Sequence, residues 1–277
     1  MADDLDDLVA RHYAVPDLTD RILKALAAAG VGADRVRPEQ LAPIDEFHIG
    51  GRAATIHAIA KMSLIAADHV LDVGCGIGGA SRYVAATIGC RVTGIDLTPE
   101  YIAAAEELTR LTGLSDRVQY RVAGALKMPF DDRTFDAAIT FHVAMNIKDR
   151  GGLYREVARV LEPGSTFCIY DVMKGEGDAL KYPVPWAETP ATSHLTTPQE
   201  MQSLLRDAGF EVAETEDRTA FGIAFFREGL AGSARGAPPL GLHIVMGATA
   251  REKFQNMLAN LENGAIAPVI MLARRGA

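Results

Sequence analysis

The chain has 277 residues, of which 48% are hydrophobic and 23% are charged; this composition is typical of globular proteins and excludes a disordered chain. Its 36 Asp and Glu residues outnumber its 28 Lys and Arg residues, which gives a formal net charge of −8. This balance argues against a nucleic-acid partner, because binding to phosphate backbones needs clustered positive charge.

Cysteine usage and hydropathy indicate the compartment. The three cysteines, Cys75, Cys90 and Cys168, are widely spaced and suggest neither a disulfide framework nor a metal site. No apolar run reaches the length of about 18 residues that a membrane span needs, and the chain begins with an acidic segment where a signal peptide is basic. We therefore expect a cytoplasmic protein with no membrane partner, present as a monomer or a homodimer.

The segment 1–64 is predicted to be mainly helical. Leu18, Ile22 and Leu26 recur at the spacing of one helix face, and Gly30 ends that helix. A second helical run follows the pair Gly50-Gly51. These helices precede any strand pattern.

From residue 69 onward, apolar runs alternate with helical patterns, which predicts a mostly parallel, doubly wound sheet with helices on both faces. A further segment, 219–262, is predicted to be mostly helical and comes before the last strand. The predicted strands are 69–73, 91–96, 117–122, 134–141, 166–172, 210–214 and 266–273.

A glycine-rich loop follows the first predicted strand. The sequence 71–79 reads Leu-Asp-Val-Gly-Cys-Gly-Ile-Gly-Gly, so its backbone can approach a ligand, and the next helix offers free N–H groups. Asp96 stands at the tip of the second predicted strand, where a carboxylate accepts hydrogen bonds from ribose hydroxyls. These features predict a ligand that contains adenosine.

Asp72 distinguishes between adenosine cofactors. A pyrophosphate would repel a carboxylate at this position, whereas the amino group and sulfonium of S-adenosylmethionine would be attracted to it. A nicotinamide-dependent oxidoreductase is therefore only a remote alternative. A non-enzymatic protein that merely binds the cofactor is another.

The motifs resemble those of a known family. Residues 70–79 resemble the first motif of class I S-adenosylmethionine-dependent methyltransferases, and 92–98 resemble their second-strand motif. Blocks at 128–132, 135–136 and 160–164 match later family motifs in order. The resemblance covers about 65–215 and implies a Rossmann-like, seven-stranded sheet whose last strand is antiparallel.

The same resemblance implies S-adenosylmethionine as cofactor, S-adenosylhomocysteine as product, and a set of cofactor contacts. The family usually has an aspartate where this chain has Gly124, so adenine recognition here would rest on backbone groups and apolar packing. The expected contacts are Asp72, Gly74, Cys75, Gly76, Asp96, Leu97, Gly124, Ala125, Leu126 and His142.

The outer segments suggest a small-molecule acceptor. Residues 45–51, 142–147, 182–186 and the tail from 253 to 274 are similar to proteins described as sarcosine/dimethylglycine N-methyltransferase-like. We slightly favour an amine nitrogen as the methylated atom. An oxygen or carbon of an apolar natural product is the alternative.

Two histidines are the candidate catalytic residues. His142 follows the fourth strand, where open α/β sheets bind their ligands, so it is either a general base or acceptor contact or a packing residue. His48 stands beside Gly50-Gly51 and either covers the cofactor and acceptor or only begins a helix.

Four further residues are candidates for acceptor binding. Tyr182 and Trp186 would line an acceptor pocket, or attract a cationic amine to their rings, unless they are simply buried. Asp171 either pairs with a charged acceptor or caps a turn, and His194 either contacts the acceptor or faces solvent.

We divide the chain into three parts on these grounds. Residues 1–64 form an N-terminal helical cap, and 65–217 with 264–277 form the cofactor-binding core. Residues 218–263 form a helical insertion that covers the acceptor site.

Overall fold

A computed structural model describes residues 2–32, 36–233 and 238–277 of the chain. Its centre is one seven-stranded sheet with the strand order β3-β2-β1-β4-β5-β7-β6. The strands are β1 (His69–Val73), β2 (Arg91–Asp96), β3 (Val118–Val122), β4 (Phe135–Phe141), β5 (Leu161–Lys174), β6 (Phe210–Asp217) and β7 (Ile266–Arg275).

The last strand runs against its neighbours. β7 pairs antiparallel with both β5 and β6, whereas β1 to β5 pair with one another in parallel. The Rossmann-like, doubly wound sheet with an antiparallel last strand, predicted from the sequence, is therefore confirmed.

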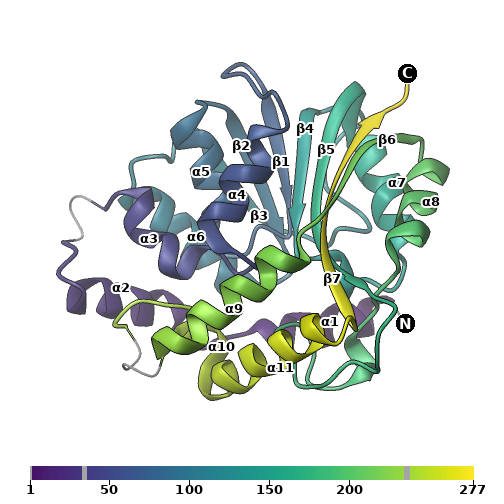
Figure 1. The fold of residues 1–277 in the computed structure, drawn as a ribbon. Coiled ribbons are helices and arrows are strands. Elements are labelled where there is room, and N and C mark those ends of the chain that lie inside the picture. Colours follow the sequence, from purple (N-terminus) through teal and green to yellow (C-terminus); the bar gives the residue numbers. More distant parts are fainter. Residues whose placement is uncertain (1, 33–35, 234–237) are drawn as a thin grey trace.

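Helices cover both faces of the sheet (Figure 1). One face packs against α4 (Gly51–Ala60), α5 (Gly79–Thr87) and α6 (Pro99–Leu111) through a core that contains Ala58, Val84 and Ile102. The other face packs against α7 (Arg150–Val160) and α8 (Pro198–Asp207) through Tyr154 and Leu205.

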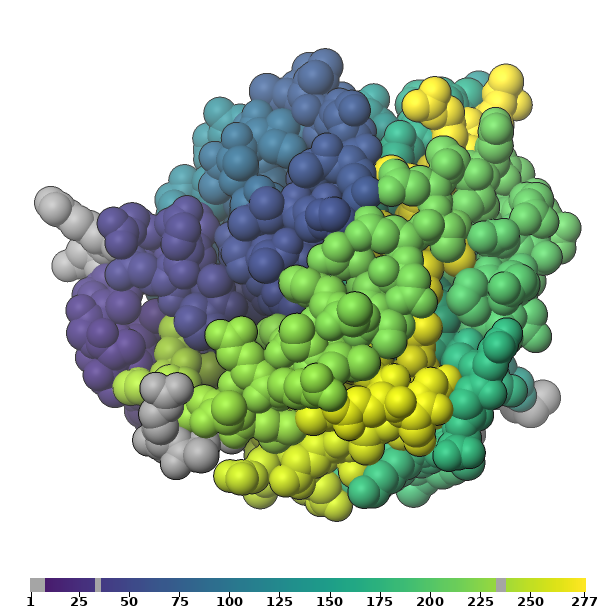
Figure 2. Space-filling view, in the orientation of Figure 1, coloured from purple at the N-terminus to yellow at the C-terminus, as the bar shows by residue number. Residues whose placement is uncertain are grey.

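The remaining helices gather along the carboxyl edge of the parallel strands, which is the lower edge in Figure 1. α9 and α11 pack against each other there, and Figure 2 shows them as adjoining green and yellow surfaces. These helices are α1 (Ala2–Tyr13), α2 (Leu18–Ala28), α3 (Pro38–Asp45), α9 (Thr219–Ser233), α10 (His243–Met246) and α11 (Ala250–Glu262). The division into cap, core and insertion stays a prediction.

One boundary differs from the sequence-based expectation. β5 begins at Leu161, whereas the sequence predicts a strand only from Thr166. Leu161 pairs with Phe135, and the register then shifts before Thr166 pairs with Ala137. Pro163-Gly164 interrupts the regular pairing, so the apolar pattern shows only the second half of the strand.

In the described part of the chain, no helix combines the length and the apolar character needed to cross a membrane.

Candidate functional site

Two adjoining cavities lie at the carboxyl edge of the sheet. The larger, of about 1180 Å³, is lined by residues at the ends of β1, β2 and β4, and we call it the strand-edge cavity. The smaller, of about 460 Å³, we call the aromatic cavity. Four side chains line both cavities: Tyr13, Phe47, His48 and His142.

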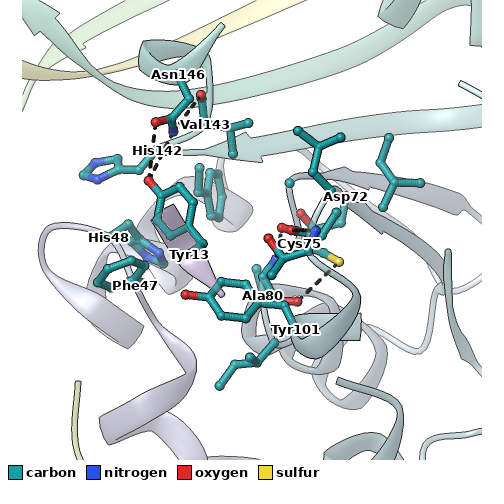
Figure 3. Close-up of a pocket in the computed structure, with 18 of the residues that line it drawn as sticks. Tyr13, Phe47, His48, Asp72, Cys75, Ala80, Tyr101, His142, Val143 and Asn146 are labelled. Atoms are coloured by element: carbon teal, nitrogen blue, oxygen red, sulfur yellow. Dashed lines mark hydrogen bonds between the residues drawn. The ribbon is translucent and has the colours of Figure 1, made fainter. Parts of the chain in front are cut away.

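The walls of the two cavities differ in chemistry. Figure 3 shows Asp72 and Cys75 on one side of the strand-edge cavity, with Phe47, His48 and His142 on the other. Apart from the four shared side chains, the aromatic cavity is lined by Ile49, Met145, Pro185, Trp186, Phe225, Phe226, Leu242, Met246, Phe254 and Met257.

The glycine loop is held against the end of β2. The backbone N–H groups of Gly74 and Cys75 donate to the carbonyl oxygen of Ile95 at 2.8 and 2.9 Å. Gly74 has a φ of 74°, and a Cβ there would lie 2.3 Å from the Val143 side chain. Glycine at 74 is therefore required by the backbone conformation and by the close approach of Val143.

Asp72 presents a buried carboxyl group to the strand-edge cavity. It is 3% exposed, and the Ser81 hydroxyl donates to its Oδ2 at 2.6 Å. Burial is the main cause that raises the pKa of Asp72 to about 7; the hydrogen bond from Ser81 opposes this rise, and the nearby charges of Glu46 and Asp96 contribute to it. No Lys or Arg is among the described residues that line the cavity. A ligand with a positive centre would supply the missing counter-charge.

Asp96 stands at the end of β2, half-buried. Its two oxygens accept hydrogen bonds from the backbone N–H groups of Gly76 (3.0 Å) and Thr98 (2.9 Å), which fix the carboxylate toward the cavity. Burial raises its pKa, and these hydrogen bonds oppose the rise. Each oxygen keeps a lone pair for a ligand hydroxyl.

The far end of the strand-edge cavity is apolar. Leu97, Ala123, Ala125 and Leu126 line it, whereas Gly124, between two of these lining residues, does not. Tyr101 adds an aromatic wall, and its buried hydroxyl has no hydrogen-bond partner among the described residues. This end accommodates a flat, apolar group.

His142 lies directly between the two cavities. Its backbone is in the left-handed region, with a φ of 56°, and its N–H donates to the carbonyl of Tyr170 at 2.7 Å. Nε2 is buried and has no hydrogen-bond partner in the described part of the structure. Burial holds the pKa of His142 well below 6.5, so the ring is neutral at pH 7.

His48 is the second imidazole at this junction, with its ring centroid 5.9 Å from that of His142. The Thr55 hydroxyl donates to Glu46 at 2.7 Å and lies 3.0 Å from Nε2 of His48. Because the hydroxyl proton goes to Glu46, Nε2 of His48 is the donor to Thr55. His48 is thus tied to a buried polar network, while His142 is not.

Tyr13 is a wall of both cavities that sequence reasoning missed. It ends α1, and the side-chain amide of Asn146 donates to its hydroxyl at 3.2 Å (Figure 3). Phe47 packs edge-on against the Tyr13 ring, with centroids 6.2 Å apart. No motif marks Tyr13, which lies far upstream of the glycine loop, so the sequence carries no signal for it.

Of the predicted acceptor residues, the structure brings Trp186, His48 and His142 to the aromatic cavity. Phe225 and Phe226, which the sequence assigned to a covering helix, also line it. Of the predicted cofactor contacts, Asp72, Gly74, Cys75, Gly76, Asp96, Leu97, Ala125, Leu126 and His142 line the strand-edge cavity. The Cys75 thiol is buried there and its pKa is raised by burial, which does not suit a nucleophile.

Asp171, Tyr182 and His194 line neither cavity. Asp171 is buried against Arg150, with Nη1 and Oδ2 3.4 Å apart, so its charge is already balanced. Arg150 also donates to the backbone carbonyl of His194 at 3.0 Å. Tyr182 is partly buried against the core that α4 and α5 form with the sheet. These positions support the cavity wall from behind.

The arrangement suits a two-ligand reaction. The two cavities adjoin and share four side chains, so ligands bound in each would lie side by side. The acidic end of the strand-edge cavity fits an adenosine ligand with a positive centre, and the aromatic cavity opens beside it. His142 stands where the two ligands would meet.

Comparison with known proteins also points to a methyltransferase. A family model described as a methyltransferase domain matches residues 71–169. The O-methyltransferase resE of Aspergillus sclerotiorum is 34% identical over 165 residues, which cover 57% of this chain and 60% of that protein. The chain spans about half the length of the curated relatives it matches.

Two solved structures share the fold across nearly the whole chain. The cyclase SpnF gives a TM-score of 0.70 at 23% identity, over 98% of this chain and 97% of that one. A putative sarcosine dimethylglycine methyltransferase from Galdieria sulphuraria gives a TM-score of 0.70 at 17% identity, over 93% of this chain and 98% of that one. At these identities the likeness concerns the fold alone.

Proposed function

We propose that this protein, whose residues 71–169 match a methyltransferase domain, transfers a methyl group from S-adenosylmethionine to a small molecule. The observation that carries the proposal is the pair of carboxyl groups at neighbouring strand ends of one cavity, the buried Asp72 and the half-buried Asp96. Nicotinamide cofactors carry a pyrophosphate that Asp72 would repel.

The chain's residues fit this cofactor. Asp96 would accept hydrogen bonds from the ribose hydroxyls, and Asp72 would face the ammonium group. Ala125 and Leu126 would pack on the adenine. When bound, S-adenosylmethionine supplies an electrophilic methyl group on a sulfonium centre.

For the acceptor, we favour a hydroxyl oxygen. A hydroxyl must lose its proton as it is methylated, and the neutral imidazole of His142, which lines both cavities, can receive one. Phe47, Tyr13 and His48 would exclude water around that proton transfer. The protein's contribution is then to hold the two reactants in line and to accept a proton.

An amine nitrogen, favoured by the sequence, is the second candidate. The ring of Trp186 and those of Phe225 and Phe226 line the aromatic cavity, and aromatic faces attract cations. A neutral amine needs no base, so this candidate gives His142 only a packing role.

The test is calorimetric titration of the protein with S-adenosylhomocysteine and, separately, with NADH. We expect micromolar binding of S-adenosylhomocysteine and none of NADH. Asp96→Ala should weaken the binding at least 100-fold, because about two hydrogen bonds to a charged group are lost. Asp116→Ala, at an exposed carboxylate outside both cavities, is the matched control and should bind like wild type.

Formation of S-adenosylhomocysteine from S-adenosylmethionine, followed across a panel of phenols, alcohols and amines, then tests for methyl transfer. Binding with no turnover on any of them would favour a non-enzymatic or non-methylating role. Binding of NADH alone would overturn the proposal.

A further inference from the structure

The aromatic cavity lacks charge. None of the described side chains that line it is Asp, Glu, Lys or Arg, and both of its histidines have pKa values lowered by burial. The charged groups nearby are already paired: Glu46 with Arg52, and Lys253 with Glu188 at 2.6 Å. An ionic ligand group placed in this cavity would lose its hydration and find no counter-charge.

The polar groups of the cavity are almost all used within the protein. The Trp186 indole N–H donates to Oγ of Ser193 at 2.9 Å, and Nε2 of His48 is occupied by Thr55. The Tyr13 hydroxyl is held by Asn146. Nε2 of His142 is the one buried polar side-chain atom on the described walls that lacks a partner. The imidazole of His142, at the junction with the strand-edge cavity, is therefore the one polar side chain of the described walls that makes no hydrogen bond within the protein and can make one with a ligand.

The rest of the wall is adaptable and apolar. Met145, Met246 and Met257 contribute flexible thioethers, and Phe226 packs edge-on against Phe225 and Phe254 with ring centroids 5.2 Å apart. Such a surface binds rings and alkyl chains through burial and dispersion, without demanding one shape.

From these observations we propose that the methyl acceptor is an uncharged, largely apolar molecule that bears its reacting hydroxyl at one end. Its apolar body occupies the aromatic cavity, and the hydroxyl meets His142. This inference rests on the proposed methyl transfer and narrows its substrate class. It excludes acceptors that carry a phosphate, a carboxylate or a fixed positive charge.

The experiment uses three probes that share a ring system: neutral 2-naphthol, anionic 2-naphthoic acid and cationic (2-naphthylmethyl)trimethylammonium. Each is titrated calorimetrically into the full chain, with and without S-adenosylhomocysteine. We expect 2-naphthol to bind at least tenfold more tightly than either ion. Equal or tighter binding of an ion, or no binding of 2-naphthol, would overturn the proposal.

A charged substitution in the wall of the aromatic cavity tests whether the probes bind there. Met246 lines the aromatic cavity from α10, and lysine and glutamine have side chains of similar length to methionine. Met246→Lys should tighten the binding of 2-naphthoic acid at least tenfold, whereas Met246→Gln, of similar length without the charge, should not. If Met246→Lys tightens the binding of 2-naphthoic acid no more than Met246→Gln does, the probes bind elsewhere and the proposal fails.

The two proposals fail in different ways. Loss of S-adenosylhomocysteine binding contradicts the proposed methyl transfer, while the probe titrations without it still report on the cavity. Normal S-adenosylhomocysteine binding with a preference for an ionic probe contradicts only the acceptor class.

Discussion

The strand-edge cavity and the aromatic cavity share four side chains but are assembled differently. The strand-edge cavity takes Asp72 and Asp96 from the ends of two adjacent strands, β1 and β2, within the short segment 72–96, and Asp45 and Glu46 from the end of α3 and the residue after it. The aromatic cavity takes its walls from segments spread between Tyr13 and Met257. The sheet topology fixes the strand ends that line the first cavity, to which docked helices add Val9, Tyr13 and Val245. Most of the second cavity exists only when helices from both ends of the chain are docked.

This difference has a functional consequence. Strand ends in a parallel sheet are rigid and held by backbone hydrogen bonds, so the groups at them stay in place while the covering helices change. We call the strand-edge cavity the cofactor half and the aromatic cavity the acceptor half. This construction allows the acceptor half to vary while the cofactor half stays the same. The predictions below test whether the two halves are separable.

The largest effect is expected where α3 packs on α5, behind the strand-edge cavity. Arg82 of α5, behind the glycine loop, is fully buried against Asp45 of α3, with Nη2 and Oδ1 2.6 Å apart. Arg82→Met leaves the buried Asp45 carboxyl with only the longer contact to Arg52, at 3.8 Å, and should lower the free energy of unfolding by about 3–5 kcal/mol. Urea denaturation measures the change.

Two further variants control this prediction. Arg82→Met combined with Asp45→Asn removes both charges and should recover part of the loss. Arg110→Met breaks an exposed pair with Glu107 and should leave the unfolding curve unchanged. If Arg82→Met is no less stable than Arg110→Met, this pair does not hold α3 against α5.

The second effect concerns His142, which lies between the two cavities. For a hydroxyl acceptor, His142→Asn should lower kcat about 100-fold, because a positioned base is lost. The Kd for S-adenosylhomocysteine should stay within about threefold of wild type. His194→Asn, at a histidine outside both cavities, should change neither value. A kcat that survives His142→Asn would instead favour an amine acceptor.

The third effect is confined to the strand-edge cavity and compares two glycines. Gly76 (φ 53°) and Gly113 (φ 70°) both have positive φ, and a Cβ at either would meet no protein atom within 4 Å. Alanine at each position should cost a similar stability, about 1–2 kcal/mol for the left-handed conformation. Only Gly76 lines the cavity, so only Gly76→Ala should weaken S-adenosylhomocysteine binding, by more than tenfold. Equal affinity in both variants would mean that the ligand does not approach Gly76.

The same contrast explains what could be predicted from the sequence. The fold and the residues of the strand-edge cavity follow from local pattern, since a strand, a glycine loop and a helix within 69–87 place Asp72 and Gly74 by covalent connection. Asp96 follows because β2 pairs with β1 in parallel register, which brings Gly94 opposite Asp72.

The aromatic cavity could not be predicted in this way. Tyr13 and Met246 sit on helices whose docking depends on tertiary packing, and the helical pattern does not state which face meets the sheet edge. Asp171 illustrates the converse: its place near the end of β5 suggested a ligand contact, but Arg150 on α7 neutralises it. The local sequence around Asp171 does not show that Arg150, on another element, will be its buried partner.

The smallest effect is the pH dependence of cofactor binding, for which Asp72 is responsible. Burial raises the pKa of Asp72 to about 7, so the carboxyl group is mostly protonated at pH 6 and mostly ionised at pH 8. A ligand ammonium group prefers the ionised form. The Kd for S-adenosylhomocysteine should therefore be up to about tenfold higher at pH 6 than at pH 8. Binding near pH 7 should release protons, detected by titration in two buffers of different ionisation enthalpy.

Asp72→Asn should bind more weakly at pH 8 and lose this slope. The stability of the ligand-free protein should move in the opposite direction. Because folding raises this carboxyl pKa from its ordinary value of 3.8, the folded state holds the proton more tightly, and this stabilisation is lost as the pH rises from about 4 to about 7. The wild type should thus lose stability relative to Asp72→Asn over that range, while its affinity for the ligand increases. If both variants show the same slope in affinity, the charge that meets the ligand is not that of Asp72, and the cofactor half would have to rely on Asp96 alone.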